Sequence, residues 1–132
     1  MGIPLEKVVG TWRLVASRAR DDEGGELPPP YGADKMGVLV LGGNGRMIAV
    51  LCDSRAAMPA GEQREYSSYC GAYTFDGATL VTRVDANSDA ARFTADQVRA
   101  IRFEGERLVL TPPPRPYKGT HMHRELFWER IA

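Results

Sequence analysis

The chain has 132 residues, the length of one domain, and its 17 basic and 17 acidic side chains give a formal net charge of zero. A nucleic-acid-binding protein usually carries a basic excess, so we expect no nucleic-acid partner. No apolar run reaches the roughly 20 residues that a membrane helix needs. The first ten residues lack the pattern of a signal peptide, so we expect a cytoplasmic protein with no membrane partner.

Helical patterns are confined to two short segments, residues 4–9 and 61–68. Strand patterns dominate, because alternating apolar and polar residues recur between clusters of glycine, asparagine and aspartate. They predict eight strands, over residues 11–20, 37–41, 46–52, 69–75, 79–85, 96–103, 107–111 and 121–130.

Short turns and long loops alternate strictly between these strands. The short turns contain Asn44-Gly45, Asp76-Gly77 and Gly105-Glu106, which are typical of tight hairpins. In an up-and-down meander the short turns then lie at one end and the four long loops at the other. Eight antiparallel strands usually close into a barrel that holds one small ligand. We therefore predict an all-β domain over residues 1–132, a single eight-stranded up-and-down antiparallel β-barrel with a short N-terminal helix or turn.

Motifs along these strands resemble those of the bacterial lipocalin-like domain family. The first strand carries Gly10-x-Trp12, and matching segments follow at residues 31–37, 45–47, 71–73, 96–99 and 128–130. The resemblance implies a barrel scaffold used both for binding and for cofactor-free catalysis. It also implies that Trp12 plugs the closed end beneath Arg130 of the last strand, a structural cation–π pair.

With Trp12 facing inward, the alternation of side chains assigns the interior face of every strand. The closed half of the interior is then apolar, whereas the charged residues of the open half are all arginines. Unpaired cations facing a semi-dry cavity are costly, which indicates a ligand with an apolar body and a carbonyl or acidic head. The alternative for Arg18 and Arg124 is that both reach the rim and contact water. The residues expected to bind the ligand are Arg18, Leu39, Leu51, Tyr69, Thr82, Ile101, Met122 and Arg124.

Three functional classes fit a barrel with one open end and an arginine-lined interior. The first is a cofactor-free isomerase or cyclase of a polyketide-like intermediate, in which Arg99, Gln97 and Tyr73 stabilise developing enolate charge. The second is a carrier or sensor that binds the same hydrophobic or amphiphilic molecule unchanged. The third is an interaction module that uses the proline-rich loops. Phe127, if exposed beside Val15, leaves a homodimer open.

Two other sets of residues could carry chemistry. His121, His123 and Glu125 share one face of the last strand, but the alternation points them outward, so we expect no metal. A strand shifted by one residue would instead bring His123 into the cavity as a general base. Cys52 and Cys70 are expected to be free thiols, although a disulfide across their hairpin stays open. No nucleotide-binding motif is present, and no cofactor is expected.

Overall fold

The computed structural model describes residues 2–132, so only residue 1 of the expected domain lies outside the description. The described chain is mostly strand, with one short α-helix and one 3-10 turn. The elements are α1 (Leu5–Val8), β1 (Gly10–Arg20), β2 (Glu26–Leu27), β3 (Lys35–Leu41), β4 (Arg46–Asp53), β5 (Tyr66–Phe75), β6 (Thr79–Asn87), η1 (Ala90–Arg92), β7 (Gln97–Glu104), β8 (Arg107–Thr111), β9 (Arg115–Tyr117) and β10 (Thr120–Arg130).

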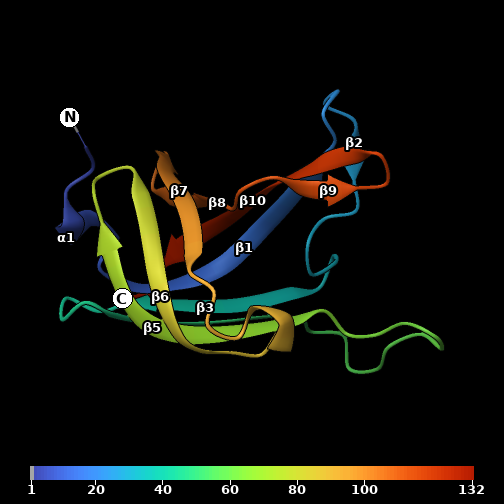
Figure 1. The fold of residues 1–132 in the computed structure, drawn as a ribbon, viewed down its shortest axis with the longest axis horizontal. Coiled ribbons are helices and arrows are strands. Elements are labelled where there is room, and N and C mark those ends of the chain that lie inside the picture. The colour runs from blue at the N-terminus through green and yellow to red at the C-terminus, as the bar shows by residue number, and fades with distance from the viewer. Residues whose placement is uncertain (1) are drawn as a thin grey trace.

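Eight of these strands form a closed antiparallel barrel, which confirms the predicted fold. Each of β1, β3, β4, β5, β6, β7, β8 and β10 pairs with its neighbour, and β10 pairs back onto β1. The closing register sets Trp12 opposite Arg130 and Arg20 opposite His123. The tight turns and α1 lie at one end, and the long loops extend from the other (Figure 1).

The two shortest strands were not expected from the sequence. β2 pairs with the end of β1, and β9 pairs with the start of β10, so both extend the barrel wall at its open end (Figure 1). The helix expected over residues 4–9 is present as α1. The second helical expectation, over residues 61–68, is wrong: Gly61 has a left-handed φ of 82°, and Tyr66 begins β5 opposite Cys52.

A layer of fully buried side chains closes the barrel at the α1 end. Trp12 is 1% exposed, and its indole N–H donates to the Val8 carbonyl at 2.9 Å. The Arg130 guanidinium lies 4.3 Å from the Trp12 ring centroid and donates to the Val9 and Lys7 carbonyls at 2.8 and 2.6 Å. Glycine is favoured at position 10, because its φ is 147° and a Cβ would lie 2.7 Å from the Ala132 carbonyl oxygen and would also meet the Arg130 guanidinium. The Gly-x-Trp motif therefore makes room for the arginine that covers its tryptophan.

A β-bulge in β1 overturns the expected orientation of Arg18. The register with β10 shifts between Leu14 and Ala16, which turns the rest of β1 over. Ala19 becomes the buried side chain, and Arg18 lies on the outer face, 3.6 Å from Glu125. The extra residue has no signature in the alternation pattern, so Arg18 was wrongly assigned to the interior.

Of the remaining expectations about the outer surface, the exposure of Phe127 is not met, whereas the expected free thiols agree with the structure. Phe127 is only 7% exposed, because it lies between Ala16 and Val109 in neighbouring strands, so it offers no exposed interface. Cys52 and Cys70 are free. They do not face each other, since Cys70 is paired with Ile48 and Cys52 with Tyr66 in the β4–β5 register.

Candidate functional site

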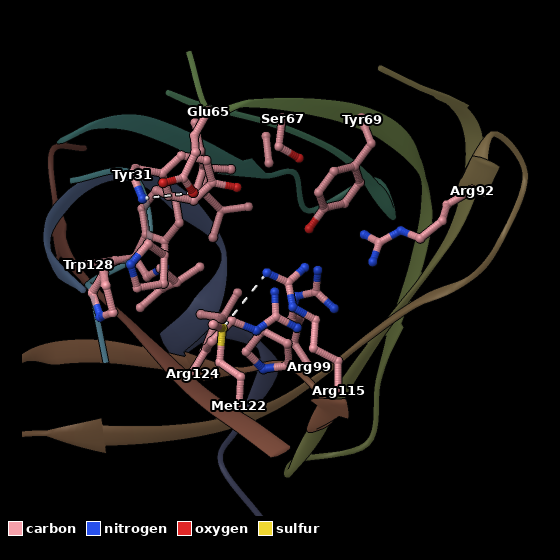
Figure 2. A pocket seen from close by; sticks show the side chains of 18 of the residues that line it. Tyr31, Glu65, Ser67, Tyr69, Arg92, Arg99, Arg115, Met122, Arg124 and Trp128 are labelled. Carbon is pink, nitrogen blue, oxygen red and sulfur yellow. Dashed lines mark hydrogen bonds between the residues drawn. The ribbon is translucent and has the colours of Figure 1, made fainter. Parts of the chain in front are cut away.

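The open half of the barrel contains a cavity of about 320 Å³, at the lower end of the usual size for small-molecule sites. Its wall toward the closed end of the barrel is apolar, and its rim at the open end is formed by loops and by β9. Figure 2 shows this pocket from close by. It is lined by Pro28, Pro30, Tyr31, Leu39, Ala49, Leu51, Glu65, Ser67, Tyr69, Arg92, Arg99, Leu110, Pro112, Arg115, Tyr117, Met122, Arg124, Leu126 and Trp128.

Four arginines from four different elements line one side of this pocket. Arg92 belongs to η1, Arg99 to β7, Arg115 to β9 and Arg124 to β10. In Figure 2 the guanidinium groups of Arg99, Arg115 and Arg124 gather together, and that of Arg92 lies beside them and points toward them. We call these four residues the arginine cluster. Segments far apart in the sequence therefore bring four positive charges to one wall.

Arg124 is the most desolvated member of the cluster. Burial, with repulsion from Arg115 and Arg99, lowers the pKa of Arg124 from 12.5 to about 10, so it remains charged at neutral pH. Within residues 2–132 its buried Nε has no hydrogen-bond partner, and Nη2 reaches only the Pro113 carbonyl at 3.5 Å. This side chain has lost hydration without gaining a carboxylate.

Gln97 lies directly behind the cluster. Its Oε1 accepts hydrogen bonds from Arg99 Nη2 at 2.9 Å and from Arg92 Nη2 at 3.0 Å. Its Nε2 donates to the Ala95 carbonyl at 3.3 Å, and the residue is 3% exposed. One fixed amide oxygen therefore holds two guanidinium groups next to each other.

Hydroxyl groups and one carboxylate line the facing side of the pocket. Tyr69 points its hydroxyl toward the cluster, whereas Tyr31, Glu65 and Ser67 lie along the opposite wall (Figure 2). Burial raises the pKa of Tyr31 above its ordinary value, so its hydroxyl stays neutral. Tyr31 adopts a left-handed φ of 65°, and its backbone N–H donates to Glu65 Oε2 at 3.2 Å. This contact fixes the loop before β3 over the pocket.

The structure brings six of the predicted site residues to the pocket. Tyr73 is not among them: it lies at the closed end, where its hydroxyl donates to the Gly42 carbonyl at 2.7 Å and burial raises its pKa. Thr82 and Ile101 are buried in the barrel interior outside the lining, and Gln97 contacts arginines instead of the cavity. The six that line the pocket are Leu39, Leu51, Tyr69, Arg99, Met122 and Arg124.

Sequence reasoning missed the lining residues that come from loops and short strands. Arg92, Arg115, Tyr31 and Glu65 have no strand alternation to indicate where they point. The available signal was the position of two proline runs, residues 28–30 and 112–114, in long loops at the predicted open end. Pro28, Pro30 and Pro112 from those runs do line the pocket.

The two histidines lie on the outside of the barrel, as the alternation predicts. His121 Nδ1 lies 2.8 Å from Asp22 Oδ2, and His123 Nε2 lies 2.7 Å from Asp22 Oδ1. Glu125, on the same face, binds Arg102 at 2.6 Å instead of the histidines. Across residues 2–132, no three His, Cys, Asp or Glu side chains are arranged to hold a metal ion.

The barrel and its internal pocket define a class of small-molecule-binding scaffold, and comparison with known families specifies it further. The model of the lipocalin-like domain family matches residues 9–131, so the chain belongs to that family. This membership suggests binding of a small hydrophobic ligand inside the barrel. No curated protein matches the sequence. Between residues 2 and 132, no helix has the length and apolar character needed to cross a membrane.

Proposed function

We propose that the protein binds a hydrophobic small molecule whose acidic or carbonyl head contacts the arginine cluster. The single observation that supports this function is the convergence of Arg92, Arg99, Arg115 and Arg124 on one wall of an otherwise largely apolar cavity. Charged groups removed from water are costly unless an opposite charge and hydrogen bonds replace the water. A ligand head that accepts hydrogen bonds would supply both.

The apolar body of the ligand would occupy the deeper part of the cavity. Leu39, Ala49 and Leu110 offer that part only carbon atoms from their side chains. Each buried methylene contributes about 0.8 kcal/mol, which gives affinity without specificity. The guanidinium groups would then select among molecules of similar shape by the chemistry of their heads.

Isothermal titration calorimetry with decanoate and 1-decanol tests this proposal, because the two probes share a tail and differ in charge. We expect decanoate to bind at least tenfold more tightly than decanol, and we expect Arg99→Met to remove most of that difference. Arg83→Met is the matched control, since Arg83 is exposed on β6 and lies outside the lining. Equal binding of both probes by the wild-type protein would sink the proposal.

A cofactor-free isomerase or cyclase acting on a polyketide-like intermediate is the second candidate. The observation that favours it is Glu65, a carboxylate across the pocket from Arg99 (Figure 2). Glu65 would take a proton from a carbon next to a carbonyl, and Arg99 would stabilise the resulting enolate. Tyr73 would take no part, because its hydroxyl is hydrogen-bonded to Gly42 at the closed end. NMR spectroscopy of the compound recovered from the protein after incubation separates a converted substrate from an unchanged cargo, because it also distinguishes isomers of equal mass.

A further inference from the structure

The charges that line the pocket are strongly unbalanced. Four arginines face it, against the single carboxylate of Glu65 on the other side. Of the four, only Arg92 has a carboxylate partner within residues 2–132, Asp89 at 3.8 Å. Arg92 and Arg115 are exposed to water, whereas Arg99 and Arg124 are half-buried. A head group with one negative charge would therefore leave at least one half-buried arginine without an opposite charge.

The Gln97 side chain adds a geometric reason for more than one negative oxygen. Without a shared acceptor, like charges on Arg92 and Arg99 would move their guanidinium groups apart. The neutral Gln97 oxygen accepts from both, at 3.0 and 2.9 Å, and so keeps the two groups adjacent without neutralising either. Each planar guanidinium retains N–H donors for an oxygen atom of the ligand.

From this geometry we infer that the ligand head is dianionic, with a phosphate monoester as the simplest class, and that Gln97 is the positioning residue that creates the preference. This inference rests on the proposed function, since it concerns the same pocket. A phosphate monoester presents three terminal oxygens and carries close to two negative charges above its second pKa of about 6. A carboxylate presents two oxygens and one charge.

Decyl phosphate and decyl sulfate form the discriminating pair of probes. Both have a tetrahedral head and the same tail, but only the phosphate becomes dianionic. At pH 8, below micelle-forming concentrations, we expect decyl phosphate to bind at least tenfold more tightly than decyl sulfate. At pH 5, where both heads carry one charge, the ratio should fall toward one. Decyl sulfate controls for pH effects from the protein's own titratable groups that face the cluster, which are Glu65, Asp89, Tyr31, Tyr69 and Tyr117.

The outcomes separate this inference from the proposed function. Equal affinities for phosphate and sulfate at pH 8, both well above that of decanol, would overturn the dianion inference and leave the proposed function standing. Affinities no higher than that of decanol for either probe would overturn both. A phosphate preference that persists unchanged at pH 5 would also overturn the inference, because the preference would then depend on head shape instead of charge.

Variants of Gln97 test its positioning role. Gln97→Leu removes the shared acceptor and should lower the phosphate-to-sulfate ratio at pH 8 at least fivefold, with decanol binding unchanged. Gln97→Glu keeps an acceptor for both arginines but adds a negative charge, so it should bring the ratio close to one even if the leucine variant fails to fold. Thr82→Val is the matched control, because Thr82 is the buried cross-strand neighbour of Gln97. A ratio unchanged in Gln97→Glu would exclude the role.

Discussion

Arg130 joins three parts of the closed end through one side chain. It covers the Trp12 ring and donates to the carbonyls of Lys7, in α1, and of Val9, directly after it. Hydrogen bonds from a charged donor and a cation–π contact each contribute on the order of 1 kcal/mol, less where the group is exposed to water. Arg130 is exposed, so its contribution to the free energy of unfolding lies toward the lower end of their sum.

We expect Arg130→Met to lower the free energy of unfolding by about 1–2 kcal/mol, because methionine retains the apolar stem but none of the donors. Urea unfolding followed by tryptophan fluorescence measures the change. Arg13→Met is the comparison, since Arg13 is an exposed arginine of β1 whose partner, Glu129, lies 3.6 Å away at the surface. If both variants lose the same free energy of unfolding, the Arg130 contacts contribute no more stability than an exposed surface ion pair.

At the scale of elements, Asp22 ties the β1–β2 hairpin to β10. The two histidine contacts hold the pKa of Asp22 at about 2, below its ordinary value of 3.8. A carboxylate with a lowered folded-state pKa contributes stability above the unfolded-state value, and this contribution is lost as the pH falls through the folded-state value. The affected window therefore runs from about pH 4 down to about pH 2.

Asp22→Asn should reduce the loss of unfolding free energy that the protein shows between pH 5 and pH 2.5. The asparagine keeps the shape of the side chain but does not titrate, so the variant starts less stable and loses less on acidification. Urea titrations at the two pH values measure the difference. Glu23→Gln, at the neighbouring exposed position, should follow the wild-type protein. An identical loss in Asp22→Asn would show that the histidine contacts carry no stability.

The elements also differ in how far the sequence determines them. All eight barrel strands follow from alternation and from turn residues, because a half-buried strand and a two-residue hairpin each need particular side chains. The bulge between Leu14 and Ala16 leaves no such pattern. It turns the side chain of every later residue of β1, including Arg18, to the opposite face of the strand. Arg92 and Arg115 lie in short elements within long loops, where no periodic pattern fixes the direction of a side chain.

At the scale of the whole molecule, the zero net charge conceals a separation of charge. Outer-face carboxylates such as Glu125 and Glu129 pair with arginines on the barrel exterior. The arginine cluster that lines the pocket has no such compensation apart from the Arg92–Asp89 pair, within the residues that the structure describes. Composition shows that the chain has no overall basic excess, but it could not reveal a cationic wall in the pocket, because that depends on how the loops close over the barrel.

This separation predicts opposite effects of Arg124 on stability and on binding. Burial lowers its pKa to about 10, so the cost of its desolvated charge is present at every pH below about 10. Replacing a buried, uncompensated charge with an apolar side chain of similar length is often stabilising. Arg124→Met should therefore raise the free energy of unfolding of the free protein by about 1 kcal/mol, equally at pH 6 and pH 8.

An acidic ligand should reverse the order of stability of the wild-type protein and Arg124→Met. A ligand at 100 times its dissociation constant adds about 2.7 kcal/mol to the stability of the protein that binds it. At a decanoate concentration that saturates the wild-type protein, the wild type should become more stable than Arg124→Met, which has lost part of its affinity. Urea unfolding with and without decanoate measures both effects, with Arg83→Met as the control. If Arg124→Met is less stable than the wild type without ligand, this expectation is wrong. Arg124 would then stabilise the empty barrel, and its charge would not indicate an acidic ligand.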